Sequence, residues 1–122
     1  MNAVRLCYAL DLKNDPALIA EYERWHEPGN VPREIVESIR AAGIHDMQIF
    51  RAGNRLFMLL EVDDDFSPAA KAANDAADPR VQAWEALMGR FQQPLPFAKP
   101  GEKWVAMTRM FSLAEALASR KR

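Results

Sequence analysis

The chain has 122 residues, of which 49% are hydrophobic and 27% are charged. This length supports one hydrophobic core and is too short for two ordinary domains, so we expect residues 1–122 to form a single domain. The formal net charge of −1 argues against the basic surface of a nucleic-acid-binding protein. No segment has the pattern of a signal peptide or the roughly 18 apolar residues of a membrane helix. Cys7 is the only cysteine, so we expect no disulfides. Together these features predict a soluble cytoplasmic protein without nucleic-acid or membrane partners.

The first part of the chain predicts a strand followed by an interrupted helix. Apolar residues alternate with others from Val4 to Leu12, which is typical of a half-buried strand. Asn14-Asp15-Pro16 then supplies a helix cap and a proline suited to a first helical turn, so a helix is expected over about Pro16–Trp25. Prolines and a glycine in His26–Pro32 interrupt it. The helix resumes near Arg33 and ends at Gly43.

The middle of the chain predicts a hairpin and two further helices. Strands are expected at Ile44–Phe50 and Leu56–Val62, joined by a turn that contains glycine and asparagine. The second strand is continuously apolar at its start, which predicts a central strand covered on both faces. One helix should span about Phe66–Ala77, and another should follow Asp78-Pro79. Apolar residues recur at helical spacing in this last helix, at Val81, Trp84, Leu87, Met88 and Phe91.

The end of the chain completes a β-α-β-β-α-β order. Three prolines and a glycine predict a loop over Gln92–Lys103, with a last strand at Trp104–Phe111. Ser112 and Glu115 form a capping-box pattern for a helical tail over residues 112–122. The order predicts an α+β protein with the ferredoxin-like split arrangement. Helices would cover one face of the sheet, and the apolar side chains of the other face favour a homodimer.

One pair of side chains has the spacing of a proton-transfer site. Tyr22 and His26 are four residues apart at a helix end, so they project from the same face. A phenol and an imidazole are suited to moving protons near neutral pH. The same spacing fits a core tyrosine and a histidine that caps the helix. Trp84 is likewise either a core residue or an apolar wall for a sugar. We find no metal-ligand spacing and no nucleotide-binding motif, so no metal or cofactor is predicted.

The segment Glu21–Pro28, which reads Glu-Tyr-Glu-Arg-Trp-His-Glu-Pro, resembles the L-rhamnose mutarotases in the relative spacing of its tyrosine, histidine and proline. Gly43-Ile44 and the stretch Val81–Trp84 extend the resemblance, which covers nearly the whole chain. It implies a dimeric α/β barrel. It also implies a cofactor-free enzyme of carbohydrate metabolism that interconverts the α and β anomers of a 6-deoxyhexose such as L-rhamnose or L-fucose.

The resemblance also implies roles for individual residues. His26 takes the position of the catalytic acid, and Tyr22 matches the tyrosine that binds the sugar beside it. Trp84 matches the first residue of a tryptophan pair that lines the site. Protonated His26 would donate to the ring oxygen of the pyranose and so open the ring, while Tyr22 would hold a hydroxyl and orient the sugar.

The chain departs from the rhamnose pattern at three places. Glu85 stands where the family has its second tryptophan, and Met47 replaces a sugar-binding tyrosine of the second strand. The loop after the proline of the motif contains an inserted Gly29-Asn30. These changes would alter the walls of the pocket, with Met47 and Glu85 as candidate substrate-binding residues, and they resemble a branch associated with L-fucose.

Two other functions fit the same sequence features. A cofactor-free monooxygenase with the same dimeric barrel architecture would share the predicted order of elements and the aromatic pocket. A non-enzymatic protein that binds a small ligand would leave Tyr22, His26 and Trp84 without a catalytic role.

Overall fold

The structure is a computed structural model that describes residues 4–120. Positions 1–3 and 121–122 of the expected domain and tail lie outside the described residues. Helices and strands follow one another as β1 (Val4–Leu12), α1 (Pro16–Trp25), α2 (Arg33–Ala41), β2 (Ile44–Ala52), β3 (Arg55–Val62), α3 (Pro68–Ala77), α4 (Pro79–Gly89), β4 (Gln92–Gln93), β5 (Val105–Ala106) and α5 (Leu113–Arg120). Among these residues no helix combines the length and apolar character needed to cross a bilayer.

The strands form one antiparallel sheet with the order β2-β3-β1-β4, and β5 also pairs with β1. β3 is the central partner, because it pairs with β1 along nearly its whole length and with β2 through the predicted hairpin. Together with the helices between the strands, this order is that of a ferredoxin-like fold. The predicted α+β class and split β-α-β-β-α-β arrangement are therefore confirmed.

The fourth strand position differs from the prediction. The predicted strand Trp104–Phe111 is wrong except at Val105–Ala106, and part of the predicted loop Gln92–Lys103 forms strand β4. Both short strands lie antiparallel to β1, with Gln92 opposite Leu12 and Val105 opposite Ala9. Proline has no N–H to donate to a sheet. The chain therefore leaves the sheet at the prolines that follow Gln93 and returns at Val105.

The start of α3 also differs slightly from the prediction, which placed it near Phe66. The helix begins at Pro68, because Ser67 is its N-cap and accepts a hydrogen bond from the backbone N–H of Ala70 at 3.0 Å. A capping serine followed by proline is a strong start for a helix. Phe66 instead packs against the core from the preceding turn.

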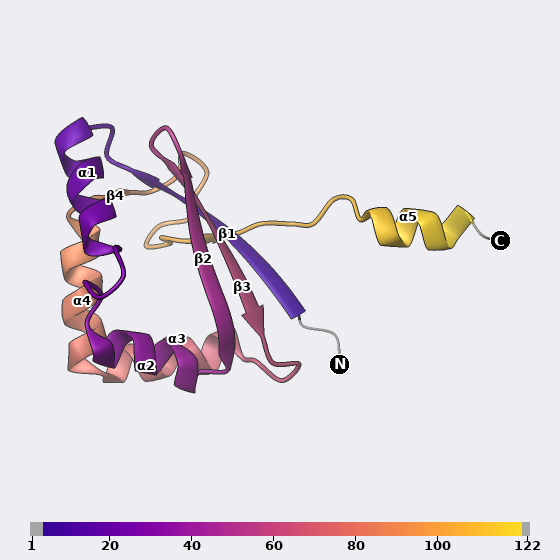
Figure 1. Ribbon diagram of the computed structural model, residues 1–122, viewed down its shortest axis with the longest axis horizontal. Helices are drawn as coiled ribbons and strands as arrows, with labels where there is room; N and C mark the ends of the chain where they lie inside the picture. The colour runs from indigo at the N-terminus through magenta and orange to yellow at the C-terminus, as the bar shows by residue number, and fades with distance from the viewer. Residues whose placement is uncertain (1–3, 121–122) are drawn as a thin grey trace.

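Helices α1 to α4 cover one face of the sheet, whereas α5 projects away from it (Figure 1). Side chains of β3 alternate accordingly: Leu56, Met58, Leu60 and Val62 are buried, and the residues between them are half-buried. The prediction that β3 is central is confirmed. The prediction that it is covered on both faces is wrong for a single chain, since all four packed helices lie on one side.

Two clusters of buried side chains fill the space between the helices and the sheet. The first joins α1, α4 and the sheet, and consists of Leu12, Tyr22, Leu56, Met88 and Phe91. The second lies towards the start of β2 and consists of Ile44, Met58, Leu60 and Val62. Ile49 and Trp104 pack against both clusters, so they link the two parts of the core.

Gly43 joins α2 to β2 in a conformation that other residues rarely adopt. Its φ is +93°, and a Cβ atom at this position would lie 3.0 Å from Oδ2 of Asp63. The backbone carbonyl of Gly43 also accepts a hydrogen bond from the N–H of Asp63 at 3.0 Å. The turn thus brings the start of β2 against the end of β3, which fixes the open end of the hairpin.

We predict that Gly43→Ala lowers the free energy of unfolding by more than the ~1–2 kcal/mol that a left-handed backbone costs an L-residue. The matched control is Gly53→Ala, because Gly53 has φ of +60° but open space around its Cβ position. It should lose only the backbone contribution. Urea denaturation of both variants measures the difference. Equal losses in the two variants would show that the close approach to Asp63 costs nothing.

Candidate active site

The site is built on the last turn of α1. At the start of the helix, Asp15 accepts hydrogen bonds from two backbone N–H groups, at 2.9 and 3.2 Å. At its end, Asn30 reaches back and donates from Nδ2 to the carbonyl of Arg24 at 2.6 Å. Gly29 has φ of +89°, which turns the chain for this contact. Gly29 and Asn30 therefore close the end of the helix that carries Tyr22 and His26.

One hydrogen bond fixes the ring of His26. Its Nδ1 lies 2.7 Å from the backbone carbonyl of Tyr22, one helical turn earlier. A carbonyl oxygen only accepts, so Nδ1 carries the proton in this contact. The second ring nitrogen, Nε2, is left for exchange of a proton with a bound molecule. Because His26 is half-buried, its ring is held in place and still partly open to solvent.

Tyr22 supports His26 from the interior. Its side chain is only 4% exposed, and its ring centroid lies 4.3 Å from that of His26. On another side it meets Phe91 edge-on at 5.9 Å. Burial raises the pKa of the Tyr22 phenol, and a hydrogen bond from Nε2 of Gln92 at 3.4 Å partly opposes this shift. With a raised pKa, the phenol is neutral near pH 7 and serves as a hydrogen-bonding group instead of a base.

Trp84 of α4 completes an aromatic group around the histidine. Its ring meets the ring of His26 at a centroid distance of 5.8 Å and that of Trp25 at 6.0 Å, both edge-on. Trp84 is half-buried and packs on the first core cluster. The structure thus brings together Tyr22, His26 and Trp84, three of the five residues singled out from the sequence.

The other two residues, Met47 and Glu85, are not part of this aromatic group. Met47 is on the helix-facing side of β2 and packs on the second core cluster, which Trp104 links to the first. Glu85 follows Trp84 on α4 and is half-buried. Within residues 4–120, neither side chain forms a hydrogen bond with Tyr22 or His26. Their role as substrate-binding residues stays a prediction.

Gln92 is a polar residue of the site that the sequence analysis missed. It belongs to the two-residue strand β4 and donates a hydrogen bond to the hydroxyl of Tyr22. The sequence predicts a loop at this position, because prolines follow it closely. No motif marks it, since its contact with Tyr22 depends on how the end of α4 meets β1.

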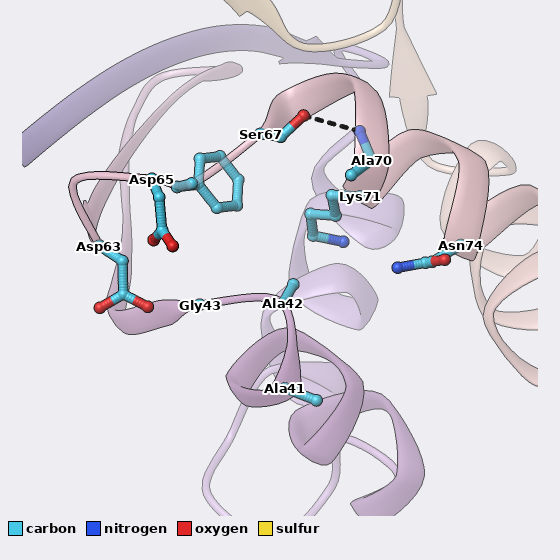
Figure 2. Close-up of a pocket in the computed structure, with 10 residues that line it drawn as sticks. Ala41, Ala42, Gly43, Asp63, Asp65, Ser67, Ala70, Lys71 and Asn74 are labelled. Carbon is cyan, nitrogen blue, oxygen red and sulfur yellow. Dashed lines mark hydrogen bonds between the residues drawn. The ribbon is translucent and has the colours of Figure 1, made fainter.

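Two hollows lie on the surface of the described residues. One of about 380 Å³ is lined by Glu21, Arg24, Trp25 and Asn30, and it adjoins the aromatic group through Trp25. The other, of about 290 Å³, lies between α2 and α3 (Figure 2). Three of its polar side chains have local partners: Ser67 caps α3, Lys71 pairs with Asp75, and Asp63 pairs with His45. Neither Tyr22 nor His26 lines this second hollow. Across residues 4–120 no three His, Cys, Asp or Glu side chains are grouped to hold a metal ion.

Comparison with known sequences assigns the chain to a family. The family model described as L-rhamnose mutarotase matches residues 5–113. The chain is 59% identical over 117 residues to the L-fucose mutarotase of Xanthomonas campestris pv. campestris, covering 96% of this chain and 94% of that protein. It is also 38% identical over 109 residues to a UPF0734 protein of Dictyostelium discoideum, covering 86% of each.

Solved structures share the fold. An L-rhamnose mutarotase from Formosa agariphila superposes with a TM-score of 0.65 at 18% identity, over 90% of this chain and 98% of that one. The tetracenomycin F2 cyclase of Streptomyces glaucescens superposes with a TM-score of 0.60 at 19% identity, over 89% and 95%. At these identities the likeness concerns the fold alone, whereas the sequence matches concern the family. The chain belongs to the L-rhamnose mutarotase family and is an isomerase that interconverts the α and β anomers of a 6-deoxyhexose.

Proposed function

We propose that L-fucose is the preferred sugar of this mutarotase and that His26 is its catalytic acid. The identity of 59% with an L-fucose mutarotase over nearly the whole chain supports the choice of sugar. The departures from the rhamnose pattern at Met47, Glu85 and Gly29-Asn30 point the same way. The observation that supports the catalytic role is the bond between Nδ1 of His26 and the Tyr22 carbonyl, since Nε2 forms no hydrogen bond within residues 4–120.

The reaction needs two proton transfers in each direction. His26 in its protonated form donates from Nε2 to the ring oxygen while the bond between that oxygen and C1 breaks. A water or a second polar group takes the proton of the anomeric hydroxyl, so that the open-chain aldehyde forms. Rotation about the C1–C2 bond and reclosure by the reverse transfers give the other anomer. An imidazole suits both directions because this type of side chain can both donate and accept a proton near neutral pH.

The other residues of the site bind and orient the sugar. The neutral phenol of Tyr22 holds a hydroxyl beside His26, and Trp84 presents an apolar wall to the C–H face of the ring. Glu85 offers a carboxylate to ring hydroxyls. Met47 fills the place of a larger polar side chain and so shapes the pocket on the side of the sheet.

We further propose that the whole chain acts as one domain and forms a homodimer. The open face of the sheet carries Phe50, which is 51% exposed and contacts Phe57. Beyond β5 the chain extends away from the sheet and helices (Figure 1). This C-terminal arm, residues 108–120, exposes apolar side chains, with Met110 at 95% and Phe111 at 67%. A second copy would cover both surfaces, which are costly to leave in water.

The cytoplasm is the proposed location of the protein. A single free thiol at Cys7 suits a reducing compartment. A role in the metabolism of a sugar taken up by the cell agrees with the same compartment.

The first test is the rate of anomeric exchange in L-fucose, L-rhamnose and D-glucose at equilibrium, measured by saturation-transfer NMR with and without the protein. We expect the largest acceleration for L-fucose, a smaller one for L-rhamnose and none for D-glucose. A larger effect on L-rhamnose would overturn the assignment of the sugar, and no effect on any of the three would overturn the proposed site as a whole.

Replacing the imidazole tests the catalytic acid. We expect His26→Gln to lower kcat by about 10²–10⁴-fold, the usual contribution of a positioned acid–base group. His45→Gln is the matched control, because His45 is exposed at the start of β2 and pairs there with Asp63, the residue after β3. It should keep full activity. Wild-type turnover in the His26 variant, with an unchanged melting temperature, would remove His26 from the mechanism.

The dimer is tested by making the C-terminal arm polar. In a Met110→Ser, Phe111→Ser double variant we expect the dimer Kd to rise more than tenfold, since burying each side chain is worth ~1.5–3 kcal/mol. Val36→Ser is the control, because Val36 is an exposed apolar residue of α2 in the helix layer. Sedimentation velocity at several concentrations measures both. A wild-type monomer, or an arm variant that dimerises like the control, would contradict the proposal.

A further inference from the structure

We propose that Gln92 is a sugar-binding residue that also positions Tyr22. One end of its carboxamide holds the Tyr22 hydroxyl, and the other end binds a ring hydroxyl of the sugar. This inference rests on the proposed active site at Tyr22 and His26, and it adds to that site a residue from a third element, β4.

The backbone around Gln92 is firmly held. Phe91, its neighbour, is 1% exposed in the first core cluster, and its carbonyl accepts a hydrogen bond from the N–H of Lys13 at 2.8 Å. Gln92 itself lies opposite Leu12 in the sheet. Cross-strand partners point to the same face, so Gln92 faces the helices as Leu12 does. Gln93 lies opposite Asp11 and faces the other side.

The carboxamide of Gln92 is only half satisfied. Its Nε2 donates to the Tyr22 hydroxyl at 3.4 Å, whereas its Oε1 is buried and has no hydrogen-bond partner among the described residues. If the amide is turned end for end, oxygen and nitrogen exchange roles, but one end still meets Tyr22 and the other is still unpaired. Buried polar groups without a partner are rare in proteins, and they call for a specific explanation.

A sugar hydroxyl is the partner whose chemistry fits this place. Ring hydroxyls both donate and accept, so they suit either end of a carboxamide. The free end lies next to the Tyr22 hydroxyl, and the ring of Tyr22 lies 4.3 Å from that of His26. A ring held by Gln92 and Tyr22 is thus placed beside the histidine that protonates it. An amide does not titrate near neutral pH, which suits a binding role and excludes one in proton transfer.

The test compares Gln92→Met with Gln93→Met by saturation-transfer NMR over a range of L-fucose concentrations. Methionine keeps the length of the side chain and removes its hydrogen bonds. We expect Gln92→Met to lower kcat/KM about tenfold, mainly through KM, because the lost contact is made in the ground state as well as in the transition state. Gln93→Met should behave as wild type. Equal kinetics in both variants would overturn the proposal.

Deoxy sugars separate binding from a merely structural role. Among 2-, 3- and 4-deoxy-L-fucose, one should lose about as much kcat/KM with the wild type as Gln92→Met loses with L-fucose. That analogue should lose little more in Gln92→Met, because the partner of the missing hydroxyl is already gone. If each of the three analogues lowers kcat/KM by the same factor in Gln92→Met as in the wild type, Gln92 does not contact the sugar and the proposal is overturned.

A second variant covers the case in which Gln92→Met melts at a lower temperature. Gln92→Asn keeps a buried amide but shortens it by one methylene, so it should also raise KM, and wild-type KM in this variant would refute the inference. Failure of the wild type to accelerate any sugar would instead remove the proposed function, so the two failures are distinguishable.

Discussion

The contact between the imidazole of His26 and the main-chain carbonyl of Tyr22 is the constraint on which the site depends. The last carbonyls of a helix have no partner within the helix, so they are available to a side chain of the following turn. Pro28 and Gly29 end α1 at this point, and His26 uses the carbonyl that the helix leaves open. The acceptor belongs to the backbone, so the orientation of the His26 ring depends on where α1 stops as well as on the rings of Tyr22 and Trp84 beside it.

The core holds that end of α1 in place. Tyr22 is buried between His26 and Phe91, and Phe91 connects α4 to β4. The carbonyl of Phe91 bonds to the N–H of Lys13 directly after β1. The first core cluster therefore ties α1, α4 and β1 together at the position where the chemistry is proposed. Close-packed interiors transmit small displacements, so a change in the first cluster would also shift Tyr22 and His26.

Much of this arrangement is predictable from local patterns. Asp15 and Pro16 mark the start of α1, and the alternation up to Leu12 marks β1, because caps and periodicities are short-range signals. The spacing of Tyr22 and His26 places both on one helix face, which the structure shows. The fourth strand position is not predictable in this way. Gln92–Gln93 is a strand only because β1 offers an open edge, and that depends on contacts between residues distant in sequence. Gln92 escapes notice for the same reason.

A backbone group orients His26, whereas side chains line the proposed pocket. This difference bears on how the preference for one sugar could change within the family. In the proposed site a main-chain carbonyl aligns His26, so substitutions at Met47 on β2 or Glu85 on α4 would alter the proposed pocket without turning the ring of His26. L-rhamnose and L-fucose differ only in the orientation of two ring hydroxyls, and distinguishing them requires hydrogen-bonding groups placed against particular positions of the ring. In the proposed site such groups belong to the sheet and to α4, whereas the proposed acid belongs to α1. Separate elements would then set the choice of 6-deoxy sugar and the proton transfer, so the first could change while the second stays the same.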